Sequence, residues 1–306
     1  VVAFDNFSNG FREPLEILKK YGTFDVIEGD LTRAEDLIGL FKKYEIDVVM
    51  HFAALCSVDE SMKAPELYFR NNVLGTINLI EAMREAKVKR IVFSSTCAVY
   101  GNAEYLPIDE KHGTKPENPY GESKLMAEKI IEWFGRLYGI QYVILRYFNV
   151  CGADSTGEIG DSKTPSLLLV QNVVRGGLGI EEFKLTCPKV DTPDGTPIRD
   201  YIDVEDIAEA HLKAFEYLEQ NKPSDVFNLG SGQGSSVREI VDAVKKELNV
   251  EFAVSEGKER QGEYKKVYAN TEKAKNIFNF KPKKTMLDSI KSLVKWYNSK
   301  PNGYEK

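Results

Sequence analysis

The sequence predicts an α/β protein with a doubly wound parallel sheet and a smaller second α/β domain. Short apolar segments alternate with segments of helical periodicity through the first half of the chain, and the alternation ends near Cys151. Strands that are apolar on both faces and separated by helices are typical of parallel sheets covered on both sides. The chain has 306 residues, of which 42% are hydrophobic, which is enough for two domains with substantial cores.

Residues 1–150 form the first expected domain. Its strands are rich in β-branched residues, and its helices have apolar positions three and four residues apart. The expected strands are Val1–Phe4, Phe24–Glu28, Val48–Phe52, Arg90–Ser94 and Tyr142–Arg146. The expected helices are Ala34–Tyr44, Ala64–Glu85 and Tyr120–Leu137.

Residues 151–306 form the second expected domain, although segments near residues 200–230 are expected to return to the first. A stretch containing Gly, Pro and Thr opens this part and reaches Arg199, broken by an expected helix at Ser166–Arg175. The later expected elements are a helix at Asp203–Asn221, a strand at Val226–Leu229, and helices at Ser236–Leu248 and Lys284–Ser299.

Composition and charge exclude several classes of protein. The 41 basic and 47 acidic residues give a net charge of −6, which argues against a broad nucleic-acid-binding surface. The apolar stretches are too short to cross a membrane, and the first residues do not resemble a signal peptide. Neither a Cys/His cluster nor a metal-binding motif occurs, so no metal site is expected. The cysteines are far apart and are expected to be reduced, in a cytoplasmic protein; they are Cys56, Cys97, Cys151 and Cys187.

Tyr120 and Lys124 are the strongest local signal for chemistry, because their spacing places both on one face of a helix. An ammonium group beside a phenol lowers the pKa of the phenol and makes it a usable base near neutral pH. The pair alone is also compatible with an ordinary amphipathic helix. However, Ser94, Ser95 and Thr96 follow a central strand, and open α/β sheets bind their ligands at the carboxyl ends of strands.

Four motifs occur in a specific order along the chain. They are Phe93-Ser-Ser-Thr-Cys-Ala-Val-Tyr-Gly101, Asn118-Pro-Tyr-Gly-Glu-Ser-Lys124, Arg146-Tyr-Phe-Asn149 and Asp194-Gly-Thr-Pro-Ile-Arg-Asp-Tyr-Ile202. Together they resemble the extended short-chain dehydrogenase/reductase family, which has a Rossmann-like fold, and within it the UDP-glucose 4-epimerases. The resemblance extends from Val1 to about Trp296. It implies an isomerase of galactose metabolism that interconverts UDP-glucose and UDP-galactose through a 4-keto intermediate with tightly bound NAD.

The resemblance also implies roles for individual residues. Tyr120 would be the base, Lys124 would lower its pKa and bind the nicotinamide ribose, and Thr96 would relay the proton. The implied NAD-binding residues are Asp5, Asn6, Asp30, Leu31, Phe52, Ala53, Asn71, Ser94, Tyr120, Lys124 and Tyr147. The implied UDP-hexose-binding residues are Thr96, Tyr120, Asn149, Arg199, Arg260 and Val267. An acidic residue at Asp5 favours NAD over NADP, and arginines suit a diphosphate.

Two glycine features matter for the cofactor. The family opens with a strand, a glycine-rich turn and a helix that holds the pyrophosphate. The strand that ends at Asp5 corresponds to the second strand of the family, so we expect that the first βα unit is missing and that its neighbours lack ladder partners. Gly230, Gly232 and Gly234 follow a strand later in the chain, but their spacing does not fit the dinucleotide fingerprint, which favours a tight turn followed by a helix cap.

Several alternatives remain open at this stage. The nucleotide-sugar 4,6-dehydratases have an Asp-Glu pair where this chain has Cys97 and Ala98. UDP-glucuronate 4-epimerases and decarboxylases differ from the 4-epimerases in a few residues of the variable region Cys151–Pro193, and a non-catalytic dinucleotide-sensing protein could share the fold. Within the resemblance, Cys56, Ser166 and Thr186 depart from the usual residues.

Two further expectations follow from the resemblance. Val267 stands where some similar epimerases have a tyrosine that restricts them to plain hexoses, so this chain is expected to accept UDP-GlcNAc and UDP-GalNAc as well. Family members commonly pair through two helices, so a homodimer through Ala64–Glu85 and Tyr120–Leu137 is expected.

Overall fold

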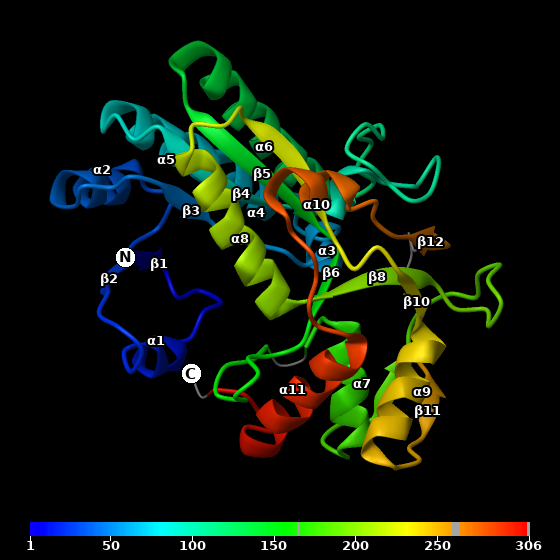
Figure 1. Ribbon diagram of the computed structural model, residues 1–306. Helices are drawn as coiled ribbons and strands as arrows, with labels where there is room; N and C mark the ends of the chain where they lie inside the picture. The colour runs from blue at the N-terminus through cyan, green and yellow to red at the C-terminus, as the bar shows by residue number, and fades with distance from the viewer. Residues whose placement is uncertain (164–165, 259–263, 305–306) are drawn as a thin grey trace.

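A parallel sheet with the strand order β3-β4-β5-β9 lies at the centre of the molecule in the computed structural model, which describes residues 1–163, 166–258 and 264–304 (Figure 1). All neighbouring strands in it are parallel. They are β3 (Val49–His51), β4 (Arg90–Thr96), β5 (Gln141–Tyr147) and β9 (Asp225–Leu229). The predicted α/β class with a parallel sheet is therefore confirmed.

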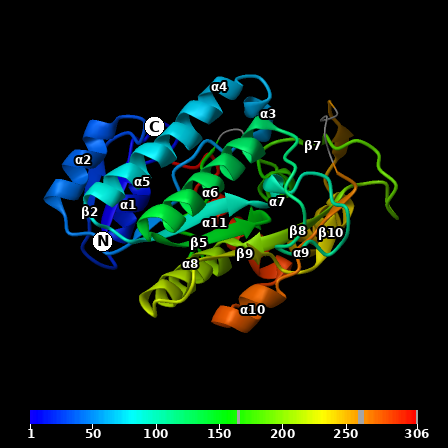
Figure 2. The same ribbon diagram turned by 90° about the horizontal axis from the view of Figure 1, so that it is seen from above.

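Helices cover both faces of this sheet (Figure 2). One face has α2 (Ala34–Lys43), α5 (Gly75–Glu85) and α6 (Pro119–Tyr138), and the other has α8 (Val204–Glu219) and α10 (Glu272–Phe278). Because side chains alternate along a strand, Ile91 and Phe93 pack with the first set and Val92 packs with the second. Coverage on both sides explains why these strands are apolar at successive positions.

The N-terminal strands form a separate small sheet. β1 (Val2–Asp5) and β2 (Asp25–Glu28) pair in parallel, with α1 (Glu13–Leu18) between them in the chain. Among the described residues, β1 does not pair with β3. One edge of β1 and one edge of β3 therefore have no ladder partner in the described residues.

A smaller region is built around β8 by elements that come mostly after β5 (Figure 1). β10 pairs with β8 antiparallel, whereas β6 and β12 pair with it in parallel; β7 pairs with β11. Val173, Ile240 and Trp296 belong to the buried cluster that joins α7, α9 and α11. The elements are β6 (Asn149–Cys151), α7 (Leu169–Gly177), β7 (Phe183–Leu185), β8 (Ile198–Asp203), β10 (Gly234–Ser236), α9 (Val237–Leu248), β11 (Val254–Glu256), β12 (Lys266–Val267) and α11 (Met286–Ser299).

Local sequence fixes both ends of α6, the helix that carries Tyr120 and Lys124. The Asn118 side chain accepts a hydrogen bond from the Gly121 amide at 2.8 Å, and Pro119 occupies the first turn. Gly139 ends the helix with φ +68°. α6 has 20 residues; in the described part of the chain no helix combines the length and apolarity needed to cross a membrane.

One helix differs from its expectation. The segment expected to be a single helix at Ala64–Glu85 is divided into α4 (Pro65–Tyr68), a π-helical turn η1 (Phe69–Leu74) and α5. Asn72 lies in the π-helical turn, is buried, and accepts a hydrogen bond from the Leu55 amide at 2.9 Å. Apolar periodicity could not reveal this turn, because the side chain of Asn72 forms its hydrogen bond with a distant loop. Two short elements complete the chain, α3 (Val58–Ser61) and η2 (Cys97–Val99).

Candidate functional site

The carboxyl end of β4 and the first turns of α6 meet at the candidate site. The Tyr120 phenol has a hydrogen bond with the Thr96 side chain. One turn further along α6, Lys124 Nζ donates to the Ser94 carbonyl oxygen at 2.8 Å. Gly121 permits this close packing, since a Cβ there would lie 2.7 Å from a backbone carbonyl oxygen of the segment after β4. The structure thus brings together four of the predicted residues from two distant segments.

Burial controls the charge of Lys124. Its side chain is buried, and this lowers the pKa to about 8, against the opposing influence of Cys56 and Glu128. The ammonium nitrogen also lies 4.8 Å from the centre of the Phe93 ring, a favourable cation–π position. Lys124 is therefore poised between its charged and neutral forms close to physiological pH.

The environment of Tyr120 differs from the expectation. Burial is the largest influence and raises the pKa of the phenol well above 10, whereas the hydrogen bond with Thr96 acts to lower it. The expected lowering by Lys124 does not dominate in this structure, because the ammonium group is directed at the Ser94 carbonyl. This environment therefore favours the neutral phenol form of Tyr120.

Aromatic rings line the edge of the site beside β4. Phe52 is 55% exposed after β3, and its ring centre lies 4.6 Å from that of His211 on α8. The Tyr147 ring is 6.3 Å from the same imidazole. His211 Nε2 is 2.9 Å from Ser94 Oγ. These contacts place the predicted residues Phe52, Ser94 and Tyr147 around one histidine. Ala53, next to Phe52, is exposed.

The predicted adenosine-binding residues lie at the ends of β1 and β2. Asn6 Nδ2 donates to Asp30 Oδ2 at 3.0 Å. Asp30 also accepts a hydrogen bond from the Thr32 amide at 2.8 Å. Burial acts to raise the pKa of Asp30, but the hydrogen bonds from Thr32 and Asn6 outweigh it, and the net shift is downward. Asp5 is exposed at the end of β1, and the Leu31 carbonyl oxygen accepts a hydrogen bond from a side chain of α5 at 2.8 Å.

The two consecutive asparagines after β3 have different positions. The predicted residue Asn71 is part-buried and donates to Asn72 Oδ1 at 3.0 Å. Asn72 is buried and donates to Ser123 Oγ on α6, also at 3.0 Å. Asn72 therefore joins the loop after β3 to the helix that carries Tyr120. The sequence interpretation missed it, although two asparagines within an apolar helical segment are an available signal.

A pocket that is partly open to solvent lies next to β8. Asn149 and Arg199, both predicted to bind the diphosphate, line it. Apolar residues from two other segments, including Leu168 and Phe183, complete the wall together with Cys187. The structure thus brings Asn149 and Arg199 to one cavity that has both charged and apolar walls.

Val267, another predicted hexose-site residue, is not among the described residues that line this pocket. Val267 on β12 is 5% exposed and belongs to a buried cluster that includes Val99 and borders Cys97. Its cluster therefore lies directly beside the end of β4, where Thr96 is placed. Arg260 lies outside the described residues.

Comparisons with known proteins identify the family. Residues 1–230 match the NAD dependent epimerase/dehydratase family. The chain belongs to this family. It is 39% identical over 307 residues to a UDP-glucose 4-epimerase of Lactobacillus helveticus, covering 100% of this chain and 92% of that protein.

Two solved structures of epimerases are also similar. One is UDP-glucose 4-epimerase from Bifidobacterium longum in complex with NAD⁺ and UDP, with 33% identity, a TM-score of 0.94 and coverage of 99% of this chain and 92% of that chain. The other is the UDP-Glc/GlcNAc 4-epimerase from Campylobacter jejuni, with 36% identity, a TM-score of 0.83 and coverage of 97% and 91%.

The residues of this epimerase-family chain fit a nicotinamide dinucleotide. At one end the exposed Asp5 carboxylate and the Asn6–Asp30 pair offer acceptors for ribose hydroxyls. At the other end are the exposed Phe52 ring, which contacts His211, and the buried Lys124 ammonium, which donates to the Ser94 carbonyl oxygen. In the described ranges no group of three or more His, Cys, Asp or Glu is placed to hold a metal ion.

The residues after Thr96 distinguish this chain from the dehydratase branch of the family. By the resemblance described above, Cys97 and Ala98 stand where the dehydratases have their Asp-Glu pair. Burial raises the pKa of the Cys97 thiol to about 12, and alanine carries no proton. Neither residue can serve as an acid or a base in the elimination of water near neutral pH.

Proposed function

We propose that this protein interconverts UDP-glucose and UDP-galactose by inverting C4 of the hexose with NAD as its cofactor. The observation that carries the proposal is the group of Thr96, Tyr120 and Lys124 at the end of β4, in a chain whose relatives named UDP-glucose 4-epimerase cover its full length. The pocket lined by Asn149 and Arg199 supplies the second part of the substrate site.

NAD, when bound, supplies a reversible acceptor for the hydride of C4. The residues that would hold it are Asp5, Asn6, Asp30 and Leu31 at the adenosine end, and Phe52, Ala53, Asn71, Ser94, Tyr120, Lys124 and Tyr147 towards the nicotinamide end. The chain's own residues must then manage the proton of the 4-hydroxyl and the orientation of the sugar.

Tyr120 Oη holds and moves the proton. It accepts the proton of the sugar 4-hydroxyl during oxidation and returns it during reduction. Thr96 Oγ1 passes this proton between the sugar 4-oxygen and Tyr120 Oη. A positive charge at Lys124 Nζ favours the phenolate form of Tyr120. Because Lys124 has a pKa of about 8, this charge is present at neutral pH and declines as the pH rises through that value.

The diphosphate is held more firmly than the hexose. Arg199 and Arg260 would bind the phosphate oxygens through charged hydrogen bonds, and Asn149 would donate an amide hydrogen to them. A loosely held hexose can then turn over within the site, so that hydride returns to the opposite face of C4. Residues 1–150, with the segments near 200–230, would bind NAD, and residues 151–306 would bind the nucleotide sugar.

The protein would act as a cytoplasmic homodimer. Its cysteines are free in the described residues, which suits a reducing compartment. Met126, Trp133 and Leu137 on α6 are 38%, 57% and 65% exposed, and their spacing places them on one helix face. On the neighbouring α4 and η1, the side chains of Leu67 and Leu74 are 47% and 39% exposed. A second copy of the chain would cover this apolar face.

The direct test is the conversion of UDP-galactose to UDP-glucose by the purified full chain supplied with NAD. UDP-GalNAc and UDP-glucuronate should be tested in parallel. The account predicts that UDP-galactose is converted and that UDP-glucuronate is not. Conversion of UDP-glucuronate alone would favour the glucuronate 4-epimerases, and tight NAD binding without any turnover would favour a dinucleotide-sensing protein.

A further inference from the structure

The glycine-rich turn between β9 and β10 binds a carboxylate of the chain itself. Asp200 on β8 is fully buried. Its Oδ1 accepts hydrogen bonds from the Ser231 amide at 2.7 Å and from Ser231 Oγ at 2.6 Å. Its Oδ2 accepts from the Gly232 amide at 3.0 Å and from the Ala269 amide at 3.1 Å. Successive backbone amides thus surround an internal anion much as they surround a phosphate in other glycine-rich loops.

Gly230 is required by the close approach of the carboxylate, and Gly232 by the backbone conformation of the turn. A Cβ at Gly230 would collide with the Asp200 carboxylate and would lie 2.9 Å from the Ala269 Cβ. Gly232 has φ +74°, a conformation that glycine adopts without strain. The Gly230 to Gly234 motif therefore has a specific ligand within the protein, which explains its resemblance to, and its departure from, a dinucleotide-binding turn.

Asp200 is joined to the pocket through its own backbone. Asn149 Nδ2 donates to the Asp200 carbonyl oxygen at 3.1 Å. Arg199 immediately precedes Asp200, and both Arg199 and Asn149 line the pocket beside β8. On β8 the Arg199 backbone is held between Ser235 of β10 and Val267 of β12. Fixing the Asp200 carboxylate therefore fixes the β8 segment that carries Arg199 and that accepts the Asn149 amide hydrogen.

We propose that Asp200, whose carboxylate is hydrogen-bonded by the glycine-rich turn, is a positioning residue for the diphosphate of the substrate. It does not touch the diphosphate itself. It acts through Arg199, whose backbone it anchors, and through Asn149, whose amide it orients. This inference rests on the proposed function, because it assumes that a nucleoside diphosphate occupies the pocket.

The Asp200→Asn variant tests this role, because the amide keeps the size of the side chain but replaces one acceptor oxygen with a donor that faces backbone N–H groups. Hydrogen bonds to a charged group are among the stronger ones in proteins. We expect the dissociation constant of UDP, measured by calorimetry, to rise about tenfold, and the KM for UDP-galactose to rise similarly. The NAD content and kcat should stay within about twofold of wild type, because the acid–base residues are untouched.

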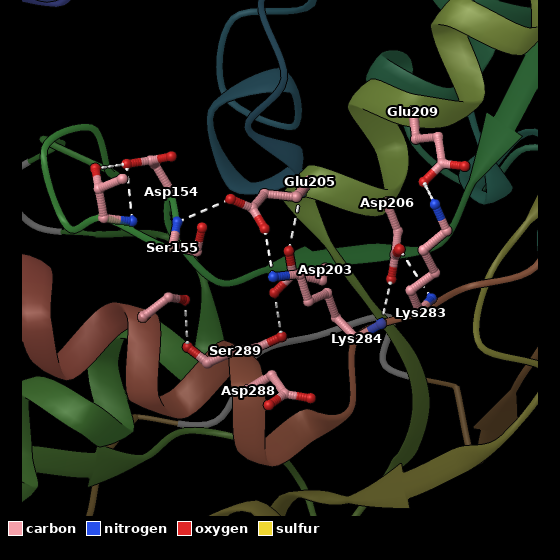
Figure 3. A network of polar contacts seen from close by, with 12 residues as sticks. Asp154, Ser155, Asp203, Glu205, Asp206, Glu209, Lys283, Lys284, Asp288 and Ser289 are labelled. Carbon is pink, nitrogen blue, oxygen red and sulfur yellow. Dashed lines mark hydrogen bonds and ion pairs between the residues drawn. The ribbon is translucent and has the colours of Figure 1, made fainter.

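Asp206→Asn is a matched control. Asp206 on α8 is also buried, and its carboxylate accepts two backbone amides, from Lys283 at 2.9 Å and Lys284 at 3.0 Å (Figure 3). It does not line the pocket beside β8. Both variants should lose thermal stability, but only Asp200→Asn should lose affinity for UDP. Ser231→Ala removes one hydrogen bond to Asp200 and should raise the dissociation constant about threefold with little loss of stability.

A double-mutant cycle with Arg199→Ala separates positioning from a general structural effect. If Asp200 acts through Arg199, adding Asp200→Asn to Arg199→Ala should weaken UDP binding much less than tenfold. Unchanged affinity in Asp200→Asn, equal losses in Asp200→Asn and Asp206→Asn, or fully additive losses in the cycle would overturn the inference. Should Asp200→Asn not fold, Ser231→Ala decides in its place. Failure of the wild type to bind UDP would instead overturn the proposed function.

Discussion

At the scale of single residues, burial determines the protonation state of the acid–base pair. It raises the pKa of Tyr120 and lowers that of Lys124 to about 8, so both side chains are held closer to their neutral forms than in water. The Thr96 hydrogen bond opposes this for the phenol. Burial therefore opposes formation of the Tyr120 phenolate, and a positive charge beside the phenol would favour it.

Val267 gives a prediction about the sugar. It is 5% exposed in the cluster that borders Cys97, and valine is much smaller than the tyrosine of hexose-restricted epimerases. We predict turnover of both UDP-Glc/UDP-Gal and UDP-GlcNAc/UDP-GalNAc, and that Val267→Tyr selectively suppresses the second pair by a steric clash. The comparison is kcat/KM for the two pairs in each protein.

Val267→Ala is the control for this substitution. It removes volume rather than adding it, so it should keep the ratio of kcat/KM between the two pairs close to that of wild type. An equal fall for both pairs in Val267→Tyr would indicate overpacking of the buried cluster. That result would mean that residue 267 does not select between the sugars.

At the scale of elements, a buried ion pair ties α6 to the central sheet. Glu128 on α6 and Arg146 on β5 are 1% and 6% exposed, and Arg146 Nε donates to Glu128 Oε1 at 3.0 Å. Removing one partner of a buried pair leaves an uncompensated charge and typically costs about 3–5 kcal/mol. We predict a loss of this size in the free energy of unfolding for Glu128→Gln, measured by urea denaturation.

An exposed pair on the same helix is the control. Arg136 and Glu132 are 65% and 29% exposed, with their charged atoms 3.9 Å apart. Exposed pairs contribute about 0–1 kcal/mol, so Glu132→Gln should change the unfolding free energy by less than about 1 kcal/mol. Similar effects of Glu128→Gln and Glu132→Gln would contradict the assignment of Glu128 as a structural anchor of α6.

Local spacing and composition made the fold class predictable, together with the placement of Tyr120 and Lys124 on one helix. The alternation of strands and helices gave the parallel sheet, and the spacing of Tyr120 and Lys124 placed both on one helix face. His211 and Asp200 could not be assigned in the same way. Each acquires its role from a contact with a segment far away in the chain, and a single sequence contains no local signal for such contacts.

At the scale of the whole molecule, α5 and α6 lie side by side on one face of the sheet, and α10 lies on the opposite side (Figure 2). Trp133 and Leu137 on α6 are exposed. We predict that the wild type sediments as a dimer and that Leu137→Glu sediments as a monomer, because a charge would be buried in an apolar interface. Ile277→Glu on α10, where the isoleucine is 45% exposed, should leave the dimer intact. A monomeric wild type would contradict this prediction.

The central claim, that C4 is inverted by hydride transfer with Tyr120 as the base, is tested most directly by proton NMR of UDP-galactose turnover in D2O. The account predicts that the wild-type chain with NAD reaches an equilibrium of UDP-galactose and UDP-glucose without deuterium at C4. Tyr120→Phe should bind UDP normally but turn over about two to four orders of magnitude more slowly. Deuterium at C4, no interconversion by the wild type, or a rate for Tyr120→Phe within a few-fold of wild type would contradict it.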